Sequence, residues 1–170
     1  MITAHVLEDK IFSNSNLAFS LYEKSRFGEK KRNKVEYSFA EAIYLLRKKK
    51  IEIFSGKNKL GEIALIKKAK KQDKRISIKL PVFTDLRNKG YIVKTALKFG
   101  AEFRVYDKGV KPGEDHAKWI LYPVKESESH SWYDFAAKNR VAHSAKKNLL
   151  IGIVDEEEDV TYYEVSWLKP

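Results

Sequence analysis

Residues 101–124 read AEFRVYDKGVKPGEDHAKWILYPV and decide how the second half of the chain folds. Alternating apolar side chains predict one strand at 101–106 and another at 117–124, joined by a loop that contains glycine and proline. The first strand ends at Tyr106, and His116 opens the second. Because neighbouring strands lie about 5 Å apart, we expect the loop to bring the imidazole back towards the phenol.

The segments around these two strands complete an α+β domain. A helical pattern that ends at Gly90 leads into a strand, which pairs with 101–106 through a turn at Phe99 and Gly100. The predicted order is strand, strand, strand, helix, strand, strand, and we expect this sheet to pack on one main helix in a domain at 81–170. The predicted strands are 91–95, 101–106, 117–124, 149–154 and 160–168, with a short helix at 83–89 and the main helix, capped by Ser129 or Ser131, around 132–143.

The first half predicts a small mixed α/β domain at 1–80. Short alternating pieces up to residue 36, among them Leu17-Ala18-Phe19, are typical of small strands and turns, with a charged loop at 28–34. Ser38 and Glu41 have capping-box spacing and predict a helix to about residue 48. A strand at 50–54 and a second helix at 60–71 follow, with Ile63, Ile66 and Ala69 expected to face inward.

The composition favours a folded protein that binds a polyanion. The chain has 170 residues and a net charge of +11, from 34 Lys and Arg against 23 Asp and Glu. A Lys-rich surface from a biased or heat-adapted proteome is the alternative explanation. The sequence has no cysteine, no signal-peptide pattern and no apolar run long enough to span a bilayer, so we expect a cytoplasmic protein with no membrane partner.

Three side chains of the second half could together carry chemistry on RNA. Strand alternation puts Phe103 and Val105 on one face, which leaves Tyr106 at a polar strand end. His116 offers a proton carrier near neutral pH, and Lys147 ends the main helical pattern. Taken singly, each has a plainer explanation: an amphipathic core tyrosine, a surface histidine and a solvated helix end.

Other polar residues give weaker signals. Arg140 lies seven residues before Lys147, two helical turns away, where its guanidinium could stack on a base or contact a phosphate. His143 lies on the apolar-leaning side of the main helix and is interpreted as structural. Histidines and carboxylates have no convincing metal-ligand spacing, so we expect neither a metal site nor a cofactor.

Several motifs in order closely resemble the archaeal tRNA-splicing endonucleases. They are YSFAEA at 37–42, GYIVK at 90–94, KFGAEFRVY at 98–106, His116 after its loop, and RVAHSAKK at 140–147. The resemblance covers nearly the whole chain. It implies an N-terminal α/β domain followed by a nuclease domain, with a restriction-endonuclease-like mixed sheet packed on a main helix.

The resemblance also implies a catalytic triad of Tyr106, His116 and Lys147, with Arg140 as a clamp on a bulged base. Trp167 is an aromatic side chain that we expect to complete this clamp. The expected reaction cuts precursor tRNA at bulge-helix-bulge intron boundaries. The ribose 2′-hydroxyl attacks its own 3′ phosphate without a metal and leaves a 2′,3′-cyclic phosphate and a 5′-hydroxyl. His116 would be the general acid, Lys147 the electrostatic stabiliser, and Tyr106 the base or a group that orients the hydroxyl.

The acidic turn Asp155-Glu156-Glu157-Glu158-Asp159 leads to a prediction about how the protein assembles with other subunits. Five like charges repel one another, so an opposing basic surface would relieve them, although a solvated turn explains them equally well. Family members are homotetramers, dimers of fused chains, or complexes of a catalytic and a structural subunit, and the resemblance implies that this turn docks into a neighbouring subunit. A non-catalytic RNA-binding subunit and a metal-dependent or DNA-binding basic protein are the competing interpretations.

Overall fold

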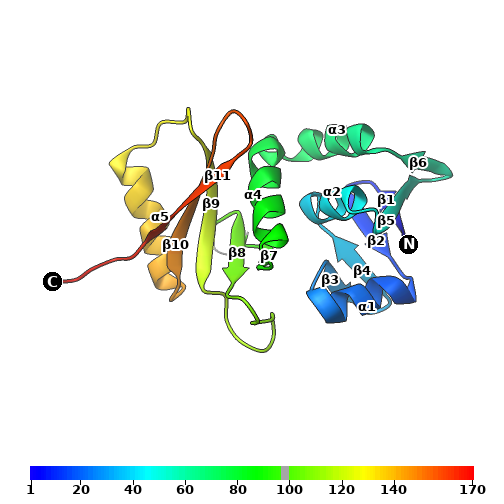
Figure 1. Ribbon diagram of the computed structural model, residues 1–170, viewed down its shortest axis with the longest axis horizontal. Helices are drawn as coiled ribbons and strands as arrows, with labels where there is room; N and C mark the ends of the chain where they lie inside the picture. Colours follow the sequence, from blue (N-terminus) through cyan, green and yellow to red (C-terminus); the bar gives the residue numbers. More distant parts are fainter. Residues whose placement is uncertain (97–99) are drawn as a thin grey trace. The chain divides into compact units, whose positions relative to one another are not determined.

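Two mixed sheets with five helices organise the chain in the computed structural model, which describes residues 1–96 and 100–170. The described residues divide into two compact units, Met1–Leu80 and Pro81–Pro170 (Figure 1). The turn predicted at Phe99 lies outside the described residues, as do the other two members of 97–99. None of the helices within the described ranges has the length and apolar character needed to cross a membrane.

The first unit is built on a sheet with the strand order β3-β4-β2-β1-β5-β6. β1 and β5 pair in parallel, and the other neighbours are antiparallel. Alternation in β1 buries Ile2, Ala4 and Val6, as expected for a strand with one covered face. The elements are β1 (Ile2–Leu7), β2 (Lys10–Ser13), α1 (Asn16–Ser25), β3 (Glu29–Lys31), β4 (Lys34–Tyr37), α2 (Phe39–Arg47), β5 (Ile51–Ser55), β6 (Asn58–Leu60) and α3 (Glu62–Gln72).

Two secondary-structure predictions for the first unit were wrong. The piece Leu17-Ala18-Phe19, predicted as a strand, is the start of α1, because the Ser15 hydroxyl accepts a hydrogen bond from the Ala18 N–H (3.3 Å) and caps a helix. The charged segment 28–34 is not a loop but the hairpin of β3 and β4. Its charges remain in solvent because β3 is an edge strand and all three of its residues are exposed.

The two later helices of the first unit were predicted more closely. The capping box at the start of α2 is confirmed, since the Ser38 hydroxyl accepts from the Glu41 N–H while the Glu41 carboxylate accepts from the Ser38 N–H. The inward face of α3 was misassigned: Leu65 and Ala69 are buried, whereas Ile63 is 86% exposed. Ile63 lies two residues before Leu65, so helical periodicity turns it away from the face that Leu65 buries.

The second unit has a sheet with the order β11-β10-β9-β8-β7, in which β9 and β10 are parallel and the other neighbours antiparallel. This confirms the predicted α+β class and the predicted succession of strands. The helix expected at 83–89 begins earlier, at Ile76, and includes Pro81. The elements are α4 (Ile76–Asn88), β7 (Ile92–Thr95), β8 (Phe103–Tyr106), β9 (Trp119–Lys125), α5 (Trp132–Ser144), β10 (Asn148–Val154) and β11 (Val160–Val165).

Helices cover both faces of this sheet, because α4 and α5 lie on opposite sides of it (Figure 1). On the α5 side, Ala142 packs in a buried cluster with Ile120, Leu149 and neighbouring residues. α4 adds a second helix layer to the one that the sequence predicted. A methyl group on Gly152 would lie 3.2 Å from a Val82 side-chain carbon, so α4 approaches β10 closely where a glycine leaves room.

A buried polar contact ties α4 to the last strand. The Tyr162 hydroxyl donates to the Asp85 carboxylate at 2.8 Å, and Asp85 also pairs with Lys89 at 2.7 Å. Burial, reinforced by the neighbouring Asp85, raises the pKa of Tyr162 above that of an exposed tyrosine. The proton therefore stays on Tyr162, and the hydroxyl remains a donor to the carboxylate.

Candidate active site at one end of the second sheet

The register of β8, β9 and β10 brings two of the predicted triad residues to the same end of the sheet. Val105 pairs with Trp119, and Trp119 pairs with Asn148, which forms one row across the three strands. Tyr106 directly follows Val105, and Lys147 directly precedes Asn148. The two residues therefore flank the start of β9, with backbones about 10 Å apart, the width of two strand spacings.

Tyr106 ends β8 as predicted, but its side chain is buried rather than at a polar surface, with only 5% of its area exposed. Arg104 lies two residues earlier on the same face, and its guanidinium carbon is 6.0 Å from the centre of the Tyr106 ring. The Arg104 Nε atom is itself buried and has no hydrogen-bond partner among the described residues. The tyrosine ring thus lies beside a cation supplied by its own strand.

The loop after Tyr106 is closed at its base by Asp107. Its carboxylate accepts from the Lys108 N–H at 2.9 Å and from the Lys118 ammonium at 3.3 Å. The Lys108 hydrogen bond, followed by Lys118, lowers the pKa of Asp107. The Lys118 N–H also donates to the Val105 carbonyl at 2.9 Å. Both ends of the loop are therefore held at the end of β8.

His116 belongs to this loop and does not open β9, which begins three residues later at Trp119. Its backbone N–H donates to the Asp115 carboxylate at 2.7 Å, and its imidazole is exposed. The preceding turn is closed by the Glu114 N–H bonded to the Lys111 carbonyl (3.0 Å). The imidazole is thus accessible to a ligand at the sheet end, where backbone turns and the Lys118 contacts hold its loop.

Lys147 stands at the C-terminal end of α5, as predicted, in a Schellman motif. Its N–H donates to the Ala142 carbonyl at 2.9 Å, and the Lys146 N–H donates to the His143 carbonyl at 2.9 Å. Lys146 adopts the left-handed conformation that this motif requires, with φ of 54°. The Lys147 ammonium lies 3.3 Å from the Ala145 carbonyl, where the helix dipole favours a cation.

Arg140 and Lys147 do not share a helix face. α5 ends at Ser144, so the seven-residue spacing does not correspond to two complete turns of one helix. Arg140 is an exposed residue on the body of α5. The helix does not continue to Lys147, because the Schellman motif ends it three residues earlier.

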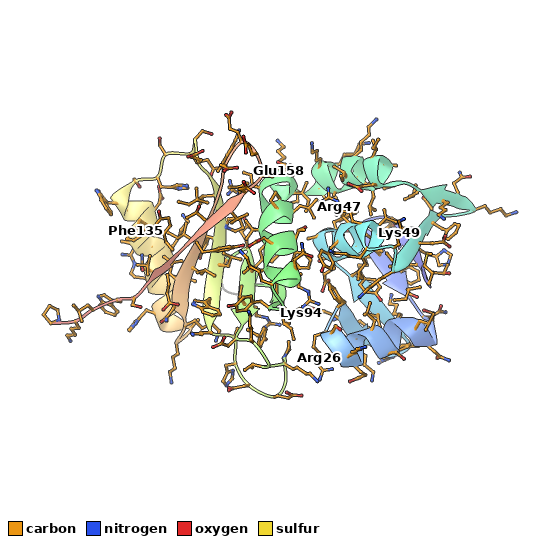
Figure 2. All side chains as sticks on the ribbon, viewed as in Figure 1. Arg26, Arg47, Lys49, Lys94, Phe135 and Glu158 are labelled. Carbon is orange, nitrogen blue, oxygen red and sulfur yellow. The ribbon has the colours of Figure 1, made fainter. Side chains whose placement is uncertain are left out.

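Arg140 instead lines a groove between α5 and the segment after β11, with a volume of about 440 Å³. Trp167, the other predicted base-binding residue, lines the same groove and is 64% exposed. Its ring contacts His143 edge-on, with centroids 4.1 Å apart, so His143 is an exposed neighbour of Trp167 rather than a core residue. Phe135 forms part of the wall (Figure 2). The remaining lining residues are Ala136, Asn139, Val165, Ser166 and Leu168.

The predicted acidic turn joins β10 and β11 and is organised by its own first residue. The Asp155 carboxylate accepts from the Glu157 and Asp159 N–H groups, both at 2.9 Å. Glu158 has a φ of 65° and stands near the tip of the turn (Figure 2). Asp155 is therefore occupied within the turn, whereas the next three carboxylates, those of Glu156, Glu157 and Glu158, are exposed.

Sequence reasoning missed Glu164, which ties the strand ends together. Its carboxylate accepts from the Trp119 indole N–H at 2.6 Å and from the Asn148 side-chain amide at 2.8 Å. These two donors begin β9 and β10, and Asn148 directly follows Lys147. The available signal was that Glu164 is the one charged residue in an otherwise uncharged return strand, VTYYEV.

The site contains donors, a cation and aromatic rings but no metal-binding cluster in the described ranges. Groups of three or more His, Asp or Glu side chains placed to hold a metal ion are absent from residues 1–96 and 100–170. The strand register brings a phenol and an ammonium to one sheet end, with a guanidinium beside the phenol, and an exposed imidazole lies in the loop that follows the phenol. These groups can exchange protons and stabilise negative charge on a phosphate.

Both units match family models. Residues 76–162 match the model for the tRNA intron endonuclease catalytic C-terminal domain, and residues 2–66 match that for the tRNA intron endonuclease N-terminal domain. The chain is 41% identical over 170 residues to a tRNA-splicing endonuclease of Thermococcus kodakarensis, covering 99% of both proteins. It is 46% identical over 141 residues to that of Nanoarchaeum equitans, covering 79% of this chain and 90% of the relative. It is 35% identical over 156 residues to that of Methanothermobacter thermautotrophicus, covering 92% and 91%.

Proposed function

The chain belongs to the tRNA intron endonuclease family, and we propose that it cuts precursor tRNA at bulge-helix-bulge intron boundaries by metal-independent transesterification. The observation that carries this proposal is the register of β8, β9 and β10. That register supports a shared site at one sheet end for Tyr106, the loop of His116 and Lys147. These are the three residues that the resemblance singles out.

The proposed reaction needs three tasks and has three groups for them. The substrate's 2′-hydroxyl attacks the adjacent 3′ phosphorus, and the bond from phosphorus to the 5′ oxygen of the next nucleotide breaks. Tyr106 takes or orients the 2′ proton, and His116 donates a proton to the departing 5′ oxygen. Lys147 stabilises the negative charge that develops on the phosphorane oxygens. The products are a 2′,3′-cyclic phosphate and a 5′-hydroxyl.

The exposure of His116 suits the general-acid role. A proton donor to a leaving group must reach the substrate, and the imidazole is exposed in a loop whose ends are bonded to the sheet. Lys147 gains its position from the Schellman motif, which sets its backbone directly before β10. Tyr106 is buried against Arg104, so its ring is held in place before a substrate arrives.

Arg140 and Trp167 are proposed to hold a base that leaves the helical stack. The groove that both residues line supports this role, because a planar guanidinium and an indole both stack on bases without reading their identity. The acidic turn is proposed to dock on a neighbouring subunit, so that two catalytic units act together on the two intron boundaries. The three exposed carboxylates at its tip support that role.

The proposal is tested with a substrate whose scissile 5′ oxygen is replaced by sulfur, in excess chelator. Wild-type protein should cut the ordinary bulge-helix-bulge RNA under these conditions. His116→Ala should lose about a hundredfold to ten-thousandfold in rate on the oxygen substrate and recover on the sulfur substrate, because sulfur leaves without a proton.

His130→Ala is the matched control, since His130 is also an exposed histidine of the second unit. It should behave like the wild type on both substrates. Cleavage that disappears in chelator and returns with a metal, while the RNA stays folded, would overturn the metal-independent mechanism. Failure of the sulfur substrate to rescue His116→Ala would overturn the role of His116 as the acid.

A further inference from the structure

The net positive charge of the chain comes entirely from its first unit. Of the 34 Lys and Arg, 20 lie in residues 1–80, together with 9 of the 23 Asp and Glu, which gives that unit the whole net charge of +11. Residues 81–170 hold the remaining 14 basic and 14 acidic residues and have no net charge. The unit that contains the candidate active site therefore has no excess charge with which to attract RNA.

Within the first unit, α3 carries a group of closely spaced unpaired lysines. Lys67, Lys70 and Lys71 are exposed at helical spacing, and Lys74 follows beyond the helix end. These four residues are called the lysine face. Among the described residues, none of the four has an ion pair or hydrogen bond from its ammonium group. The one acidic residue of α3, Glu62, is at the opposite end of the helix and pairs with Arg47 at 2.9 Å.

Several other basic residues of the same unit have carboxylate partners. Lys30 pairs with Glu23 at 3.3 Å, and Lys34 pairs with Glu36 at 3.0 Å. Lys31 and Lys59 also have carboxylate partners, Glu29 and Glu52. The lysine face differs from these pairs because its charges have no internal partner. A row of like charges on one helix face repels itself, and an external polyanion would relieve that repulsion.

We propose that the lysine face binds the phosphate backbone of precursor tRNA through contacts separate from those of the candidate active-site residues, a role that rests on the proposed function. From Lys67 to Lys71 the face extends about 6 Å along α3, because a helix rises about 1.5 Å per residue, and Lys74 follows beyond the helix end. A nucleic-acid backbone presents phosphates at a comparable density. Ammonium groups on flexible stems contact phosphates without reading bases, so the face adds affinity and not sequence preference.

An acidic protein segment is a weaker fit than RNA. The most acidic segment of this chain, the turn Asp155–Asp159, carries five carboxylates. Docking one such turn from a second copy would leave more than half of the +11 charge of the first unit uncompensated. RNA supplies one negative charge at every nucleotide and can extend over the whole helix.

The test is the salt dependence of binding, measured with the full chain. The probe is a bulge-helix-bulge precursor tRNA with 2′-deoxy nucleotides at the cleavage sites, so that binding is measured without cleavage. One variant replaces the lysine face with alanine, and a matched variant replaces four ion-paired lysines. The two sets are Lys67, Lys70, Lys71 and Lys74, and Lys30, Lys31, Lys34 and Lys59.

Both variants lose four positive charges from the same unit. The lysine-face variant should lower the slope of log Kd against log salt concentration by about 3, since each phosphate contact contributes about 0.7–0.9. The matched variant should keep a slope close to the wild-type value. Both should keep the wild-type single-turnover rate on cleavable RNA at saturation, because neither set belongs to the candidate active site.

Equal slopes in the two variants would overturn the inference, since only overall charge would then matter. An unchanged slope with a smaller assembly, measured by sedimentation, would overturn it in favour of a protein partner on this face. Loss of cleavage by the wild type, with its binding slope intact, would instead count against the proposed function. The two failures are therefore distinguishable.

Discussion

Replacing Glu164 should loosen the end of the sheet where the candidate active site lies. Glu164→Ala removes the acceptor for the Trp119 indole (2.6 Å) and for the Asn148 amide (2.8 Å). Hydrogen bonds to a charged group contribute about 1.5–3 kcal/mol each, but Glu164 is exposed and water competes for both donors. We therefore expect a combined loss of about 1–2 kcal/mol in the free energy of unfolding.

The effect on cleavage should exceed the effect on stability. Asn148 directly follows Lys147, so a shift at the start of β10 moves the ammonium that is proposed to stabilise the phosphate. A displacement of about 1 Å at a catalytic group can cost about a hundredfold in rate. Glu164→Gln should fall between the wild type and Glu164→Ala, because the amide keeps one acceptor oxygen for the two donors.

The assay combines thermal unfolding with single-turnover cleavage at saturating RNA, well below the melting temperature. Glu126→Ala is the control, since Glu126 is an exposed carboxylate of the same unit whose side chain bonds to none of the described residues. A Glu164→Ala protein with the melting temperature and cleavage rate of the control would refute the reasoning. Equal losses in the Gln and Ala variants would refute the graded role of the two acceptor oxygens.

Three further predictions concern other parts of the second unit. Tyr162→Phe should cost about 1–2 kcal/mol by removing the donor to Asp85. Folding raises the pKa of Tyr162 above the ordinary 10.0. As pH rises, the Tyr162 hydroxyl therefore loses its proton at a lower pH in the unfolded protein than in the folded protein. Its stability therefore falls above pH 10, and denaturant unfolding at several pH values should show a shallower fall for the variant. Arg140→Ala should weaken binding of bulged RNA more than of fully paired RNA in a direct binding assay, and equal losses would contradict the clamp. Charge reversal in the acidic turn, by Glu156→Lys, Glu157→Lys and Glu158→Lys together, should split the assembly and abolish paired cleavage. A full-size oligomer that still makes both cuts would contradict docking of the turn on a neighbouring subunit.

The second unit could be predicted because its signals are local. Alternation in β8 and β9, the Ser131 cap of α5 and the apolar run of β10 each determine an element over a few residues. α1 was missed because the short apolar run Leu17-Ala18-Phe19 also suits a strand, and because Ala18 is its one fully buried residue. The hairpin of β3 and β4 was missed because its exposed charges hide the alternation that buries Val35 and Tyr37.

The sequence by itself determined the order of the elements in the second unit, the family, and that a phenol and an ammonium stand at element ends. It did so because helix caps, strand alternation and the glycines and prolines that end elements act between residues close in the chain. Only the tertiary structure decided that Glu164 bonds Trp119 and Asn148, and that Arg140 and Trp167 line one groove. Both depend on residues 16 to 45 positions apart that the sheet brings together. Strand register and helix packing set such contacts, and local propensity carries no information about either.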